Sequence, residues 1–108
     1  MENETVLCVS NMYEQKYYLN PDFDGLPKSV KDELKIMCVL FTEDVGGVMA
    51  VVFNDEGNLI LQTSQKEDDF AHDEIGSVLK IKELQRTKSE LFESLERYYK
   101  EFWCQIDI

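Results

Sequence analysis

LPKSVKDELKIMCVLFTEDVGGVMAVVFNDEGNLILQTS, residues 26–64, is the stretch of sequence that decides the fold. From Val30 to Val45 its apolar residues recur at three- and four-residue steps, which is the spacing of one helical face. Pro27 suits the first position of a helix, and Gly46 is a typical residue at a helix end. The first half of the stretch therefore predicts a helix of roughly 18 residues.

Residues 36–41, IMCVLF, leave a second interpretation open, because a short apolar run can also be a buried strand. Glu43 and Asp44 also lie unfavourably at the carboxyl end of a helix, where the helix dipole prefers cations. Gly46 favours the helix, since glycine just past the last periodic residue commonly ends one. We prefer the helix and keep the strand as the alternative.

The second half of the stretch predicts a β-hairpin. Residues 48–53 are apolar on both alternating faces, as in a central strand, whereas residues 59–63 become more polar and suit a less buried neighbour. Residues 54–58 form the turn between them, with Gly57 at the positive φ. We expect the rest of the chain to pack around this helix and hairpin.

Segments on either side of this unit complete the predicted fold. Upstream, residues 6–9 and 15–19 are rich in β-forming residues and can pair as a hairpin through a turn at residues 10–12. Downstream, the strongest apolar period of the chain predicts one helix from Ser77 to Trp103. That helix would be about 40 Å long, against roughly 30 Å across a compact domain of this size. We therefore expect part of it to project or to be covered by a partner.

The order of these elements, ββαββα, predicts an α+β fold. The simplest arrangement has two layers, with an antiparallel sheet of about four strands and both helices on one of its faces. The chain of 108 residues is expected to be a single domain over residues 1–108, with one core that needs no metal or disulfide.

The chain is strongly acidic, with 22 Asp and Glu residues against 11 Lys and Arg residues and a net charge of -11. Such a surface repels nucleic acids and anionic membranes, which bind to clustered Lys and Arg. We therefore expect no nucleic-acid partner and no membrane partner.

The three cysteines, Cys8, Cys38 and Cys104, show no CxxC spacing, and each has apolar neighbours. This pattern is typical of reduced, mostly buried thiols in a cytosolic protein. The first residues carry no basic-then-apolar signal pattern, and the longest apolar run, residues 36–41, is too short to span a bilayer. We therefore expect a cytoplasmic protein.

Residues 20–25, NPDFDG, offer one candidate cation site. Asn20, Asp22 and Asp24 occupy the first, third and fifth positions of a pattern that opens an EF-hand calcium loop, with glycine at the sixth. The pattern then fails, because the twelfth position is Lys31 where a bidentate glutamate is needed. We prefer an Asx-rich turn that leads into the helix.

Residues 67–74, EDDFAHDE, offer a second candidate, with His72 as the single histidine of the chain. Adjacent residues of a loop cannot all face one ion, and no HExxH or paired-cysteine spacing organises them. We prefer a solvated loop in which Asp73 or Glu74 favours the start of the next helix. The chain has no GxSxG, GxGxxG or GKS/T motif, so we predict no enzyme, no cofactor and no catalytic residue.

The aromatic end of the final helix is the best candidate for an interaction surface. One helical stripe cannot bury all of its aromatic residues against a small sheet, and Tyr and Trp are enriched at binding hot spots. We predict a homodimer, or binding of another protein, through a surface made of Leu91, Leu95, Tyr98, Tyr99, Phe102 and Trp103.

Three segments, YLNPDFDGLP at 18–27, TEDVGG at 42–47 and IGSVLK at 75–80, resemble a family of small uncharacterised bacterial proteins known only as a domain of unknown function. The resemblance covers most of the chain and implies no activity. The ββα order is also loosely similar to that of roadblock and longin-type domains, which are dimeric scaffolds.

The function predicted from the sequence is therefore a non-enzymatic cytoplasmic interaction or scaffold domain that self-associates through its C-terminal helix. The alternative is a regulatory domain that binds a small ligand or a divalent cation at residues 20–25 or 67–74.

Overall fold

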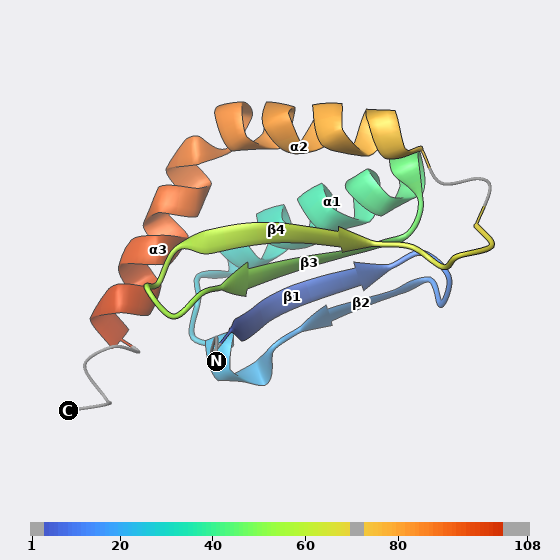
Figure 1. Cartoon of the computed structure of the whole chain (residues 1–108). Coiled ribbons are helices and arrows are strands. Elements are labelled where there is room, and N and C mark those ends of the chain that lie inside the picture. Colours follow the sequence, from blue (N-terminus) through green and yellow to red (C-terminus); the bar gives the residue numbers. More distant parts are fainter. Residues whose placement is uncertain (1–3, 70–72, 103–108) are drawn as a thin grey trace.

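Four antiparallel strands form one sheet in the order β2-β1-β3-β4 (Figure 1). The computed structural model describes residues 4–69 and 73–102. The first hairpin consists of β1 (Thr5–Asn11) and β2 (Lys16–Leu19), and the second of β3 (Val48–Phe53) and β4 (Leu59–Ser64). β3 is central and β4 lies at an edge, which confirms the assignment made from their polarity.

The turn of the first hairpin lies later than the predicted residues 10–12, because β1 continues to Asn11. The side chain of Asn11 accepts hydrogen bonds from the backbone N–H groups of Tyr13 at 3.0 Å and Glu14 at 3.3 Å, as in an Asx turn. Gln15 then has a φ of 53°, which turns the chain back into β2.

One helix, α1 (Lys28–Val45), covers one face of the sheet and packs on β1 and β3 (Figure 1). Residues 36–41 are helical, so the helical interpretation is confirmed and the strand alternative is wrong. Pro27 stands directly before the first helical residue. Gly46 ends the helix with a φ of 81°, and its N–H donates to the Thr42 carbonyl at 2.8 Å.

The prediction of one long final helix was wrong, and the order is ββαββαα. Two helices, α2 (Glu74–Thr87) and α3 (Ser89–Phe102), meet at Lys88, whose φ of −110° and ψ of 20° are not helical. A straight helix would carry its last turns past the sheet. The bend lets α3 turn down across the end of the sheet while α2 runs beside α1, above β4 (Figure 1). The apolar period continues through the bend because both helices face the same core.

The core lies between α1, α3 and the covered face of the sheet. β1 contributes two consecutive buried residues, Leu7 and Cys8, because its register with β3 shifts between Val6 and Cys8, as in a β-bulge. Phe23, in the short helix η1 (Pro21–Phe23), closes one end of the core. The buried apolar residues of the core are Leu7, Cys8, Phe23, Leu26, Leu34, Met37, Cys38, Phe41, Val45, Met49, Val51, Phe53, Leu91, Phe92 and Leu95.

Candidate functional site

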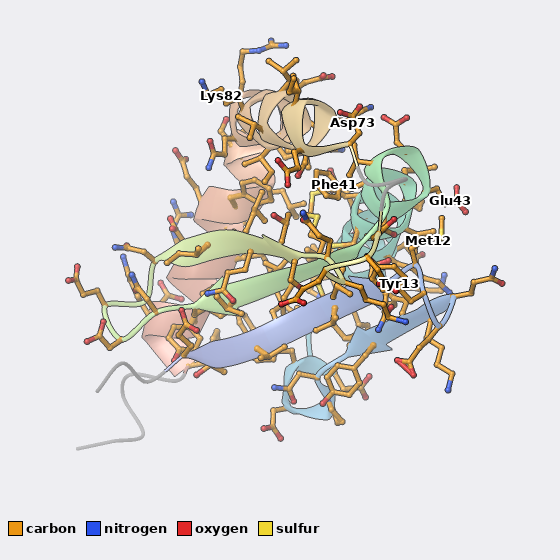
Figure 2. The ribbon with its side chains drawn as sticks, turned by 45° about the vertical axis from the view of Figure 1, so that its right-hand side comes forward. Met12, Tyr13, Phe41, Glu43, Asp73 and Lys82 are labelled. Carbon is orange, nitrogen blue, oxygen red and sulfur yellow. The ribbon has the colours of Figure 1, made fainter. Side chains whose placement is uncertain are left out.

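A groove of about 460 Å³ runs between α1 and α2. Its apolar lining comes mainly from α1, through Ile36, Met37, Leu40 and Phe41, and Leu84 faces them from α2. Figure 2 shows Phe41 of α1 below α2 and Lys82 of α2 pointing away from α1. The full lining consists of Ser29, Asp32, Glu33, Ile36, Met37, Leu40, Phe41, Lys80, Glu83, Leu84 and Lys88.

Two large apolar side chains of this groove are exposed to solvent. Ile36 is 59% exposed and Leu40 is 58% exposed. They lie four residues apart on the side of α1 that turns away from the sheet, while Leu34 and Cys38 face the sheet and are buried. On a helical wheel of α1 this pair lies outside the buried stripe, and that position is the sequence signal for it.

Ion pairs join α1 to α2 at both ends of the groove. Lys88 Nζ lies 3.0 Å from Glu33 Oε2, and Lys80 Nζ lies 2.7 Å from Asp44 Oδ2. The Asp44 carboxylate raises the pKa of Lys80, so this lysine stays charged. Both lysines of the groove are thus already bound to carboxylates of the same chain.

The rim of the groove carries further negative charge in addition to the carboxylates of these two ion pairs. Asp32 and Glu83 also line the groove, and the whole chain has a net charge of -11. Asp32 pairs with Lys28 one helical turn earlier, at 2.9 Å, but both side chains are largely exposed and the pair is weak in water. The groove therefore combines an apolar floor with a negative border.

The apolar surface continues onto the first half of α2. Ile75 is 77% exposed, and Val78 and Leu79 are also exposed. Leu79 lies one helical turn before Glu83, which lines the groove. A helix that is apolar on several sides is normally covered on more than one side. Three apolar residues therefore form an exposed patch on the solvent side of α2, beside the groove.

A second, more polar pocket of about 530 Å³ opens between α1 and the first hairpin, at the end of the molecule where Figure 2 labels Met12 and Glu43. Ser10 of β1 and Thr42 of α1 form its floor, and their buried hydroxyl oxygens lie 2.8 Å apart. Tyr17 of β2 also lines this pocket.

A pair of thiols lies next to that floor. Cys8 Sγ and Cys38 Sγ are 3.8 Å apart, and both residues are fully buried. The hydrogen bond with Cys38 lowers the pKa of Cys8, against the opposite effect of burial, whereas the same bond and burial raise the pKa of Cys38. Burial also raises the pKa of Tyr17, whose hydroxyl lies close to both thiols.

The first predicted cation site is an Asx turn in the structure. The Asn20 side chain accepts a hydrogen bond from the Asp22 N–H at 3.0 Å and caps η1. Lys31 Nζ lies 3.2 Å from Asp24 Oδ1 and 3.0 Å from the Asp24 carbonyl oxygen. Lys31, which occupies the glutamate position of the EF-hand pattern, thus binds one of the three candidate ligands itself.

Two carboxylates of the second predicted cation site, Asp69 and Asp73, have separate structural roles. Asp69 accepts a hydrogen bond from the Tyr13 hydroxyl, which ties the loop to the first hairpin. Asp73 caps α2 as expected, because its Oδ1 accepts from the Gly76 N–H at 2.8 Å. His72 lies outside the described residues. Over residues 4–69 and 73–102, no three His, Cys, Asp or Glu side chains gather as metal ligands.

Most of the predicted interaction residues on the final helix hold α3 on the core. Leu91 and Leu95 are buried, and Tyr98 and Tyr99 are half-buried against the core. Phe102 is 56% exposed and packs on the Tyr98 ring. Trp103, the sixth predicted residue, lies outside the described part of the chain. Their role in binding a partner stays a prediction.

Comparisons with known proteins give a family but no activity. A family model described as "Family of unknown function (DUF6145)" matches residues 4–107. No curated protein and no solved structure matches the chain, so the similarity to roadblock and longin-type domains gains no support. Among the described residues, no helix is long and apolar enough to cross a membrane.

Proposed function

The chain belongs to the DUF6145 family, a family of unknown function, and we propose that it is a non-enzymatic interaction domain that binds a partner in the groove between α1 and α2. One observation carries the proposal. Ile36 and Leu40 are large, exposed and side by side on the wall of an open groove. Exposed apolar residues grouped in this way are typical of protein-binding surfaces.

The shape of the groove suits an amphipathic helix. Two antiparallel helices form its walls, and the ion pairs at Glu33 and Asp44 lie about 16 Å apart along α1, or three helical turns. A partner helix of that length presents apolar residues at three- and four-residue steps, which can contact Ile36 and Leu40. Leu79 on the border would extend the contact.

The charge of the groove indicates that the partner helix is basic. Asp32 and Glu83 line the groove, and the two lysines beside them are bound to carboxylates. Lys or Arg residues flanking the apolar face of a partner would meet this negative border. A second copy of the chain is a poorer occupant, because each copy has a net charge of -11.

Self-association through the C-terminal helix remains a separate proposal. It is supported by Phe102, which is exposed at the end of α3 beside Tyr98. Binding of a divalent cation at residues 20–25 has less support, since Lys31 already pairs with Asp24.

Titration with a synthetic helix tests the proposed function. The probe carries leucines at three- and four-residue steps with lysines elsewhere, and binding is followed by amide chemical shifts of the labelled protein. We expect shifts in α1 and α2, and an affinity about tenfold or more lower for Leu40→Glu. The matched control is Tyr18→Glu, which places the same charge on an exposed residue of β2.

The control separates groove binding from general attraction to an acidic protein. Attraction alone would make both variants bind the basic probe slightly more tightly. Shifts confined to α3, or equal affinities of wild type and Leu40→Glu, would contradict the proposal. A dimer in light scattering that Phe102→Glu dissolves would instead support self-association.

A further inference from the structure

We propose that Cys8 and Cys38 are a redox pair, which a hydroperoxide oxidises to a disulfide, with Cys8 as the attacking sulfur. This inference does not depend on the proposed function. The two sulfur atoms come from different layers of the fold, β1 and α1, and lie 3.8 Å apart. A disulfide bond is about 2.05 Å long, so the sulfurs need to approach by less than 2 Å.

The packing of α1 on β1 favours this approach. Cys8 and Ser10 lie two residues apart on one face of β1, and Cys38 and Thr42 lie four residues apart on one face of α1. Their small side chains let Cα atoms of the two elements come within 8 Å of each other. A disulfide normally joins Cα atoms less than about 7 Å apart, so α1 and β1 must lie within that distance at Cys8 and Cys38 when the bond forms.

The hydroxyl of Tyr17 is the second, independent observation. It is buried and has no hydrogen-bond partner that meets normal geometry among the described residues. A buried hydroxyl without a partner is costly and uncommon in folded proteins. A thiolate at Cys8 would supply the missing acceptor, because Tyr17 pairs with Ser10 across the sheet and Cys8 lies two residues away on the same face of β1.

The two thiols therefore differ in their chemistry. In the thiolate form, Cys8 accepts hydrogen bonds from the Cys38 thiol and the Tyr17 hydroxyl, while Cys38 keeps its proton. Lys35 and Glu43 are charged residues of α1 on the same pocket, and Lys16 faces them from β2. The thiolate is the reactive form of cysteine, so Cys8 reacts first.

The polar pocket brings a small hydroperoxide near the two sulfurs, which are fully buried and do not line it, so the Ser10 and Thr42 side chains at its floor must open to admit the peroxide. The floor of the pocket is the Ser10–Thr42 pair. Ser10 lies two residues after Cys8 on β1, and Thr42 lies one helical turn after Cys38 on α1. Thr42 Oγ1 also donates to the Cys38 carbonyl at 3.3 Å. Hydroxyl groups at this floor can bind the oxygen atoms of a peroxide beside Cys8.

The reaction balances in two steps. The Cys8 thiolate attacks one peroxide oxygen, the O–O bond breaks, and Cys8 becomes a sulfenic acid while the other oxygen leaves as an alkoxide or hydroxide and takes up a proton. The Cys38 sulfur then attacks the Cys8 sulfur, and the sulfenic oxygen leaves as water with the Cys38 proton. Two thiols lose two electrons in total, and the O–O bond of the peroxide gains them.

Mass spectrometry tests the pair in a Cys104→Ser protein, which removes the third thiol. The folded protein is treated with hydrogen peroxide, quenched with catalase, unfolded and alkylated with N-ethylmaleimide. We expect a protein that has lost two hydrogen atoms, takes up no maleimide and yields a peptide joining Cys8 to Cys38. Two maleimides on every molecule after prolonged treatment would overturn the proposal.

Single variants test the assignment of Cys8. With dimedone present, Cys38→Ser, which keeps a hydrogen-bond donor at residue 38, should trap a sulfenic acid on Cys8, whereas Cys8→Ser should leave Cys38 about tenfold or more slower to react. Equal rates for the two variants would refute the role of Cys8. In urea the difference should disappear, because it depends on the fold.

Tyr17→Phe provides a test that leaves both thiols in place. Loss of a hydrogen bond to a thiolate raises its pKa by about one unit, so oxidation at neutral pH should slow about tenfold. The control is Tyr18→Phe, which removes an exposed hydroxyl from the next residue of β2. If Tyr17→Phe were oxidised as fast as the control, the Tyr17 hydroxyl would have no role in stabilising the Cys8 thiolate.

Discussion

Tyr99 of α3 stacks on Phe53 at the end of β3, with ring centroids 4.3 Å apart and an angle of 11° between the ring planes. Phe23 stacks on the other two rings at 5.8 Å and 6.4 Å. Three segments that are far apart in the sequence thus form one aromatic cluster. The bend at Lys88 is what brings α3 to this position.

Tyr99→Ala should destabilise the fold by about 3 kcal/mol, since it removes a large ring from the core and leaves a cavity beside Phe53. Phe102→Ala on the same helix should change the free energy of unfolding by less than about 0.5 kcal/mol, because Phe102 is exposed. Urea unfolding measures both. Equal small effects would mean that α3 is held mainly by a partner and not by the core.

Gly46→Ala should cost about 2 kcal/mol. Gly46 has φ 81° and ψ −175°, a conformation that residues with a Cβ atom rarely adopt. Gly25→Ala is the matched control, because a Cβ there meets only the Tyr98 hydroxyl at an ordinary 3.4 Å. If thermal unfolding showed the two variants to be equally stable, the turn between α1 and β3 would not need its glycine.

The amides of α2 should exchange with solvent faster than those of α1. Ser77 is the one residue of α2 that is fully buried, and exposed ion pairs at Lys80 and Lys88 hold the helix in place. Higher salt screens such pairs and should speed exchange in α2 more than in α1. Hydrogen exchange read by mass spectrometry gives both rates. If the amides of α2 were protected from exchange as well as those of α1, the prediction would be wrong and α2 would be a rigid wall of the groove.

Tyr17→Phe should leave the free energy of unfolding unchanged or raise it slightly. The variant removes a buried hydroxyl that has no hydrogen-bond partner among the described residues, and with it a desolvation penalty. Thr42→Val is the contrasting variant, because it takes a partner from the buried Ser10 hydroxyl and should cost about 1–3 kcal/mol. Urea unfolding at neutral pH compares them. A large loss of stability in Tyr17→Phe would mean that the hydroxyl is a structural element of the core.

The stability of the protein should fall as the pH rises above about 10. The pKa of Tyr17 is raised in the fold by burial and by the neighbouring thiols, so the unfolded chain loses this proton near pH 10 while the folded chain keeps it. The stabilising effect of the protonated hydroxyl is therefore full below that pH and is lost above it. Burial and the Asp69 carboxylate also raise the pKa of Tyr13, which therefore acts in the same direction. Urea unfolding across this range should show a smaller fall for Tyr17→Phe than for wild type.

Hydrophobic periodicity and turn residues were enough to predict the two hairpins, their antiparallel sheet and α1. Gly46 and Gly57 marked real chain reversals, both with positive φ. The bend at Lys88 was missed because the apolar spacing is the same on both sides of it. A periodic pattern reports which residues face the core, and it carries no signal for a change of helix direction.

The candidate sites were harder to predict than the fold. The groove depends on where α2 lies relative to α1, which no local pattern specifies. Cys8 and Cys38 were recognised as buried, but their contact requires the register of β1 against α1 and the bulge at Leu7. The predicted surface on the final helix named residues by their spacing, and four of them pack in or against the core.

The hydrogen bond between Thr5 Oγ1 and Tyr99 Oη, at 3.0 Å, joins the first strand to the last helix. β1 also lies in the middle of the sheet and pairs with β3, some forty residues later in the chain. During synthesis, the aromatic cluster at Phe53 therefore stays uncovered until α3 has left the ribosome. A chain that stops before α3 would expose this cluster to other chains, so truncation there should produce aggregates and not a smaller folded domain.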